Sequence, residues 1–216
     1  VTMVSYIFDN DFAGHAFREA LVRARDRSVA VRVLIDDVGA RYTKPTMVRE
    51  LAQAGVRVAA FLPTRVPRLY QYANLRNHRK IMVVDGRVGF TGGMNIRAGH
   101  WRSRNPEAPV RCVHFRVDGP IVADMQEAFV TDWMFTTGEQ LEGGRWFAPV
   151  LDAGPVAARG VPDGQTPTST TCRSCCSGRS RWRLGACAWC RRTSCPTTGC
   201  CARCRWRRCV ACRWTS

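Results

Sequence analysis

The chain has 216 residues, enough for one sizeable domain, and 45% of them are hydrophobic, as a globular core requires. Its net charge of +16 suggests a nucleic acid or an acidic membrane as partner, yet eleven of its 33 basic residues and none of its acidic ones lie after residue 163. The remaining 22 basic and 17 acidic residues give the first three-quarters of the chain a net charge of only +5. No stretch of the sequence reaches the roughly 18 apolar residues of a membrane-spanning helix.

The first part of the chain alternates predicted strands and helices. Met3–Phe8, Val29–Ile35 and Val56–Leu62 are apolar and predict strands, whereas Phe12–Arg27 and Pro45–Ala54 have helical spacing. The β-α-β-α-β order predicts an α/β layer with a largely parallel sheet. Because the first strand starts almost at residue 1, we expect further residues upstream in the natural protein.

The second part adds three strands and one helix. The predicted segments are the strands Arg79–Val84, Arg87–Thr91 and Cys112–Val117 and the helix Ile121–Phe135. Asp85 and Gly86 separate the first two strands and form a strong two-residue hairpin signal. The predicted fold class is therefore α/β, with a mixed or mostly parallel sheet flanked by helices. His114, on the last strand, is interpreted as structural.

A polar group of residues surrounds the predicted hairpin. His78 and Lys80 are two apart on an extended segment, so their side chains should project from the same side. Gly92 and Gly93 end the returning strand, where bare backbone amides can approach an anion, and Asn95 adds a side-chain donor. An imidazole, an ammonium, amides and a carboxamide in one small volume predict a phosphate site that contains a nucleophile.

Each residue type suits a role at such a site. One ring nitrogen of His78 can attack phosphorus, and Lys80 is a positive charge for a phosphate oxygen. Asp85 is assigned a structural or orienting role, because Asp-Gly pairs are common in hairpins without any chemistry. A lone histidine on a strand is more often a satisfied core residue. Here the functional interpretation is favoured, because six residues of suitable type stand together in this stretch: His78, Lys80, Asp85, Gly92, Gly93 and Asn95.

The spacing H-x-K-x4-D-x6-G-G-x-N resembles the HKD signature of the phospholipase D superfamily, and RNHRK and FTGGMNI around it resemble the first such motif of bacterial cardiolipin synthases. The resemblance covers roughly Met3 to Val161. It implies His78, Lys80 and Asp85 as catalytic residues, Gly92, Gly93 and Asn95 as phosphate ligands, and no metal or other cofactor.

The resemblance also implies a function. Such enzymes transfer a phosphatidyl group from one phosphatidylglycerol to another through a phosphohistidine, and a second motif supplies the histidine that acts as general acid. This chain has a single H-x-K, so a homodimer that completes the site and an inactive fragment both stay open, beside a hydrolytic phospholipase D and a single-motif nuclease. The implied partners are phosphatidylglycerol and a bacterial cytoplasmic membrane surface, rather than nucleic acid.

The resemblance also suggests supporting residues. RVLIDDVGA resembles a family segment, which makes Asp36 a candidate carboxylate behind the site, and Asn77 precedes the histidine directly. A strand-end turn residue is the simpler interpretation of Asp36. Trp101 and Arg102 follow the motif and are candidates for contact with substrate or membrane.

Residues 164–216 form a second predicted region, distinct from 1–163 and expected to be irregular or disordered. Eleven of the twelve cysteines lie there, including four C-x-x-C pairs. Zinc sites and an arginine-rich nucleic-acid arm are two interpretations. The third interpretation, a shifted reading frame, is favoured because it explains the many cysteines and tryptophans of this region. A leucine codon displaced by one base yields the first two bases of a cysteine or tryptophan codon.

Overall fold

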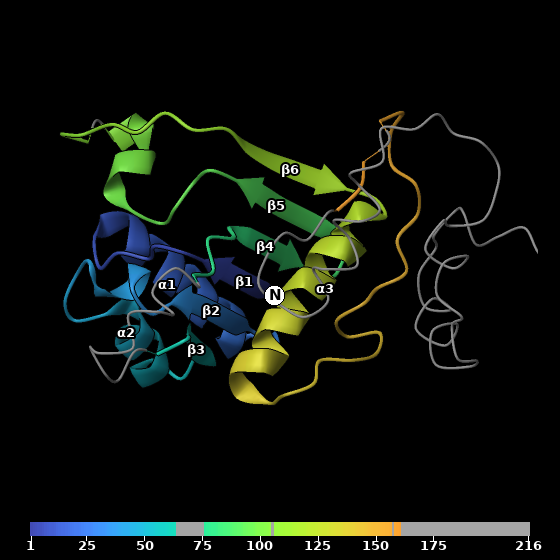
Figure 1. Cartoon of the computed structure of the whole chain (residues 1–216), viewed down its shortest axis with the longest axis horizontal. Coiled ribbons are helices and arrows are strands. Elements are labelled where there is room, and N and C mark those ends of the chain that lie inside the picture. The colour runs from blue at the N-terminus through green and yellow to red at the C-terminus, as the bar shows by residue number, and fades with distance from the viewer. Residues whose placement is uncertain (64–75, 105, 157, 161–216) are drawn as a thin grey trace, which may run out of the picture. The chain divides into compact units, whose positions relative to one another are not determined.

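A six-stranded mixed sheet forms the centre of the structure, a computed structural model that describes residues 1–63, 76–104, 106–156 and 158–160. The strands are β1 (Thr2–Ser5), β2 (Arg32–Asp36), β3 (Val58–Phe61), β4 (Ile81–Val84), β5 (Val88–Gly92) and β6 (His114–Asp118). Their order across the sheet is β3-β2-β1-β4-β5-β6 (Figure 1). The region predicted beyond residue 163 lies outside the described residues.

The direction of the strands changes in the middle of the sheet. β1, β2 and β3 are parallel, whereas β1–β4, β4–β5 and β5–β6 are antiparallel pairs. The predicted mixed sheet is confirmed, but parallel pairing is limited to the first three strands. The Asp85-Gly86 hairpin accounts for the antiparallel β4–β5 pair: both residues have positive φ, 53° and 64°, and return the chain directly beside β4.

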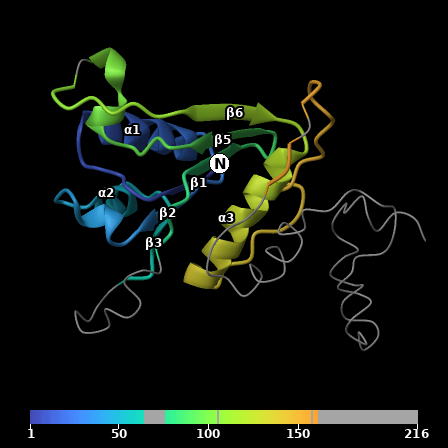
Figure 2. The same ribbon diagram turned by 45° about the horizontal axis from the view of Figure 1, so that its top comes forward.

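Among the described residues, three α-helices cover the sheet, with α1 (Phe12–Asp26) and α2 (Met47–Gln53) on one face and α3 (Ile121–Thr137) on the other (Figure 2). Short 3-10 turns span Gly39–Arg41, Ala98–His100 and Arg102–Arg104. Local sequence sets the helix ends. Asp11 caps α1 by accepting from the Gly14 amide at 2.9 Å, and Gly138 ends α3 with a left-handed φ of 75°.

The two-residue period of the strands divides the core into two layers. Met3 and Val33 pack toward α1 and α2, whereas Val4 and Leu34 pack toward α3 with Phe129. All five are at most 3% exposed. No helix within the described ranges is long and apolar enough to cross a membrane.

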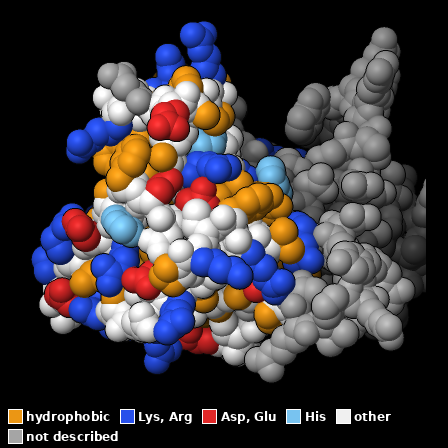
Figure 3. Space-filling view, turned by 90° about the vertical axis from the view of Figure 1, so that its left-hand side faces the viewer, with side chains coloured by type: hydrophobic (Ala, Val, Ile, Leu, Met, Phe, Trp, Pro, Cys, Tyr) orange, Lys and Arg blue, Asp and Glu red, His pale blue; other side chains and the backbone are white. Residues whose placement is uncertain are grey.

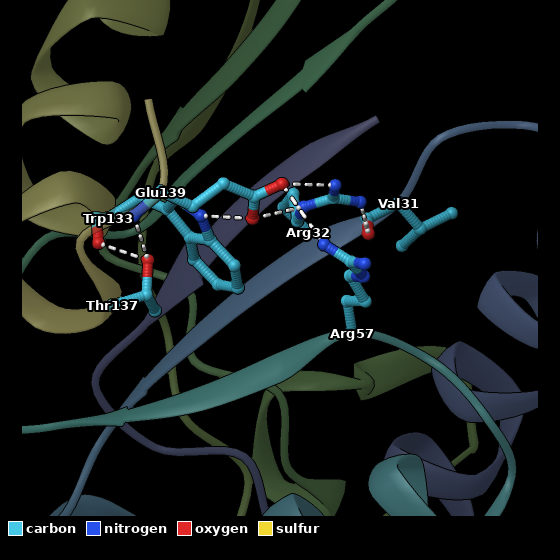
Figure 4. Close-up of polar contacts among 6 residues, drawn as sticks. All are labelled: Val31, Arg32, Arg57, Trp133, Thr137 and Glu139. Carbon is cyan, nitrogen blue, oxygen red and sulfur yellow. Dashed lines mark hydrogen bonds and ion pairs between the residues drawn. The ribbon is translucent and has the colours of Figure 1, made fainter. Parts of the chain in front are cut away.

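A carboxylate just beyond α3 fixes the end of this helix to the sheet (Figure 4). Glu139 accepts from Arg32 Nε at 2.9 Å and from Trp133 Nε1 at 2.9 Å, and pairs with Arg57 at 3.1 Å. The Arg32 guanidinium also lies 5.4 Å from the ring centroid of Trp146. The start of β2 is thereby joined to the residues that follow α3.

Candidate active site

All of the predicted site residues except Asp85 gather at one end of the sheet. There the parallel strands β1 to β3 end, β4 begins, and Gly92 at the end of β5 lies opposite His114 at the start of β6. Strand ends of this kind are where α/β sheets place ligand-binding groups. This end is open at the surface, since both His78 and Gly93 are exposed.

His78 and Lys80 lie together, as the alternation along an extended segment predicts. Lys80 donates to the backbone oxygen of His78 at 2.8 Å, and its Nζ lies 3.3 Å from His78 Nδ1. The lysine is 7% exposed, whereas the imidazole is exposed. A buried cation is thus fixed against an accessible ring.

Tyr6 is a site residue that the sequence analysis missed. Its ring centroid lies 4.4 Å from that of His78, and Lys80 Nζ lies 5.4 Å from the same tyrosine ring. Tyr6 directly follows β1, just as Asp36 ends the neighbouring parallel β2. This shared position at the end of a parallel strand is the signal that could have identified it.

The surroundings of His78 favour its neutral form. Partial burial lowers the pKa of its imidazole and the charge of Lys80 lowers it further, against an opposing effect of Asp36. Burial also lowers the pKa of Lys80. At neutral pH the imidazole therefore has a free lone pair, which a nucleophile requires.

Asp36 and Asn77 hold the segment that carries His78. Asp36 is fully buried and accepts from the backbone amides of Asn77 at 2.9 Å, Val38 at 3.0 Å and Gly39 at 3.3 Å. Burial raises the pKa of the Asp36 carboxyl, and these three hydrogen bonds oppose the rise. Asp36 is therefore a strand-end residue, as the simpler interpretation predicts, and it also holds the residue next to the histidine.

The two glycines make close backbone contacts with the start of β6 and the residue before it. The Gly93 amide donates to Val113 O at 2.8 Å, so it is not a free donor for an anion. Gly92 has a φ of 151°, and a Cβ on it would lie 2.4 Å from Val113 O and 2.7 Å from His114 Cα. The missing side chain therefore allows β6 to approach the end of β5 closely.

Asn95 contacts the loop after β1. Its Oδ1 accepts from the Ile7 amide at 3.3 Å, and the Ile96 amide next to it donates to Ile7 O at 3.1 Å. Because the carboxamide oxygen is occupied, the NH₂ group is the part of Asn95 left for a phosphate oxygen.

Asp85 is not brought into the site. Asp85 follows β4 and Lys80 precedes it, so the four extended residues of this strand place the two roughly 15 Å apart. Its charge acts instead on the terminal ammonium of Val1 at the opposite end of the sheet. The structure therefore places Asp85 in the turn between β4 and β5, away from His78 and Lys80.

Two further histidines lie near the motif. His114 Nδ1 is buried without a hydrogen-bond partner in the described part of the chain. His100 Nδ1 lies 3.3 Å from the Cys112 sulfur, and burial, with the charges of Arg97, Lys80 and His114, lowers the pKa of His100. No group of three or more His, Cys, Asp or Glu residues that could hold a metal ion occurs among the residues described.

Comparisons with known proteins identify relatives of this chain. A family profile described as "Cardiolipin synthase, PLD-like domain" matches residues 1–133. The chain is 35% identical over 147 residues to a cardiolipin synthase of Halalkalibacterium halodurans, which covers 68% of this chain and 29% of that protein. It is 38% identical over 135 residues to cardiolipin synthase A of Pseudomonas fluorescens, which covers 62% and 28%.

This chain thus spans less than a third of the length of these relatives. Among solved structures, the phospholipase D family member Nuc from Salmonella typhimurium aligns with a TM-score of 0.44 and 19% identity, covering 62% of this chain and 78% of Nuc.

Proposed function

Since this chain belongs to the PLD-like domain family of cardiolipin synthases, we propose that His78 cleaves the phosphodiester of an anionic phospholipid and transfers its phosphatidyl group to an alcohol. The observation that carries the proposal is the contact of His78 Nδ1 with the buried Lys80 ammonium at 3.3 Å, in which His78 itself is exposed. It combines a nucleophile with a fixed positive charge for phosphate.

In the first step Nε2 of His78 attacks phosphorus of phosphatidylglycerol. A P–N bond forms, the P–O bond to the headgroup glycerol breaks, and the glycerol oxygen takes up a proton. For Nε2 to attack, Nδ1 must carry the ring hydrogen. The Lys80 ammonium then turns its donor from Nδ1 to a phosphate oxygen, where its charge offsets the charge that develops.

In the second step the hydroxyl of another phosphatidylglycerol attacks the phosphohistidine. A new P–O bond forms, the P–N bond breaks, the hydroxyl proton leaves, and neutral His78 is restored. The NH₂ group of Asn95 would hold a phosphate oxygen in both steps. Water in place of the lipid hydroxyl would give phosphatidic acid.

The leaving oxygen needs an acid, which typically contributes roughly 10²–10⁴ in rate. The sequence has one H-x-K, so we include in the proposal a second copy of the chain whose His78 faces the first. The turnover rate should then rise with the square of the protein concentration at low concentration.

A membrane surface is the proposed site of the reaction, because the substrate is a lipid. Phe12 is 45% exposed, its ring lies 5.8 Å from that of Trp101, and the Arg104 guanidinium lies 5.4 Å from the same indole. Figure 3 shows one face of the molecule, on the upper part of which basic and hydrophobic side chains lie side by side. Aromatic rings with neighbouring arginines suit an anionic lipid surface.

The test is incubation of the full chain with phosphatidylglycerol vesicles, followed by mass spectrometry at neutral or alkaline pH. A phosphatidyl adduct on His78, with release of glycerol, is expected. His78→Ala should abolish both, whereas His15→Ala on α1 should change neither. Cardiolipin as product indicates transfer and phosphatidic acid indicates hydrolysis. Cleavage of DNA without lipid turnover, or no adduct at any protein concentration, would contradict the proposal.

A further inference from the structure

A single carboxylate on α3 contacts the residues on both sides of His78. Asp132 Oδ2 accepts from Asn77 Nδ2 at 2.7 Å and forms an ion pair with Arg79. The Asp132 side chain is 1% exposed and that of Arg79 18% exposed. The residues that flank the proposed nucleophile are therefore held by one buried group from a distant part of the chain.

This contact fixes a direction. In an extended segment, alternate side chains point to opposite sides. Asn77 and Arg79 point toward α3, so His78 and Lys80 point away from it, toward Tyr6. The contacts of Asp132 with Asn77 and Arg79 therefore determine the direction in which the side chains of His78 and Lys80 point.

The chain is held a second time through its backbone. The Asn77 amide donates to Asp36 at 2.9 Å, and the Arg79 amide donates to Asn77 Oδ1 at 3.2 Å. Asn77 thus uses its amide, its carboxamide oxygen and its carboxamide nitrogen within one network. Such a residue has little freedom to rotate, and neither has the histidine beside it.

The core alone does not account for a charge at position 132. Phe129 and Trp133 on the same helix supply the apolar packing against the sheet. A buried ion pair adds little stability compared with apolar residues of the same size, because removing both charges from water costs several kcal/mol. The geometry that Asp132 imposes on the segment 77–79 is the more specific consequence of its presence.

We propose that Asp132 is a positioning residue that aims the imidazole of His78 at the phosphorus atom through Asn77 and Arg79. This inference rests on the proposed function of His78, but its effect on the imidazole can be measured without any substrate.

The experiment is an NMR titration of the imidazole ring protons of His78, assigned with His78→Gln, in the full chain and in Asp132→Ala. Removing a negative charge alone would lower the pKa of His78. Releasing the ring from Lys80 and from partial burial would raise it, because these two causes keep it low. A rise in the pKa of His78 is therefore expected, and an unchanged or lower value would overturn the proposal.

Turnover gives an independent measurement. For Asp132→Ala we expect kcat to fall by roughly 10²-fold with little change in KM, since a misaimed nucleophile reacts slowly while the substrate still binds. Asp132→Asn keeps an acceptor oxygen for Asn77 and should recover most of the loss. Asp124→Ala is the matched control, because Asp124 lies on the same helix and accepts from the Gly160 amide at 3.0 Å. An equal loss in this control would contradict the proposal.

If Asp132→Ala does not fold by circular dichroism, Asn77→Ala decides the question. This change removes the contact through Asn77 but leaves the Asp132–Arg79 ion pair, and it should raise the pKa of His78 in the same direction. A wild-type chain that shows the expected titration but no lipid turnover would refute the proposed function and leave the positioning intact. An active wild type with unchanged titration and kcat in both variants would refute the positioning alone.

Discussion

Replacing Glu139 with glutamine removes the charge that joins the end of α3 to β2 and β3. The hydrogen bond from Arg32, with smaller effects of Trp133 and Arg57, lowers the pKa of Glu139 from its ordinary 4.5 to about 2. At about 1.4 kcal/mol for each pKa unit, this difference corresponds to about 3 kcal/mol. Because the side chain is 30% exposed, solvent screens part of this energy, and we expect Glu139→Gln to lower the free energy of unfolding by about 2 kcal/mol.

The pH dependence tests whether the charge is responsible. A carboxyl group whose pKa is lower in the folded state stabilises fully above its unfolded pKa and loses this effect as pH falls through the folded value. The contribution of Glu139 should thus be complete above about pH 5 and decline from pH 4.5 toward about 2. Urea unfolding followed by circular dichroism, for wild type and Glu139→Gln at several pH values, measures it.

The expected result is a difference between the two proteins that is largest at pH 7 and shrinks in acid, since protonated glutamate resembles glutamine. Equal unfolding free energies at pH 7 would refute the reasoning. A difference of the same size at pH 7 and pH 3 would show that shape or neutral hydrogen bonding, rather than charge, holds α3 in place.

Three further predictions concern the site. The kcat/KM for phosphatidylglycerol should rise with pH through a His78 pKa below 6.5 and fall as Lys80 deprotonates below its ordinary 10.5, as a pH–rate profile would record. Gly39→Ala should destabilise the fold by about 3 kcal/mol in urea unfolding and reduce turnover, because the new Cβ would lie 1.7 Å from Tyr6 O. Asp85→Asn should leave kcat within about twofold of wild type in the same lipid assay, because asparagine tolerates the positive φ of this turn.

Controls make these outcomes decisive. Gly144→Ala is matched to Gly39→Ala, since a Cβ at Gly144 meets no atom within 4 Å, and it should be silent in both assays. A kcat/KM that shows no decrease at acid pH, over the range in which the protein stays folded, would contradict the role of a titrating histidine. A large loss of kcat in Asp85→Asn with unchanged stability would restore Asp85 to the site.

The sequence predicted those parts of the site that depend on local geometry. Two residues on one extended segment share a side, so the contact of His78 with Lys80 followed from their spacing alone. The same local argument gave the hairpin at Asp85. The same argument did not give the distance from Lys80 to Asp85 across β4. The motif groups His78, Lys80 and Asp85, and this grouping suggests that the three lie close together, which an extended strand does not permit.

The contacts that were missed join distant parts of the chain. Asp132 is 55 residues from Asn77 and meets it only because α3 crosses the sheet beneath the site. Tyr6 meets His78 because β1 lies beside β4. The role of Gly93 also depended on such pairing, since only the position of β6 shows that its amide is already occupied.

Asp132 and Trp133 are consecutive residues of one helix, and one contacts the network below the imidazole while the other fills the hydrophobic interior. A small rotation of that helix, made to accommodate a new side chain in the interior, would therefore also turn the ring of His78. Substitutions among buried apolar residues that barely change the melting temperature should still alter turnover, so a slow variant of this protein need not be an unfolded one.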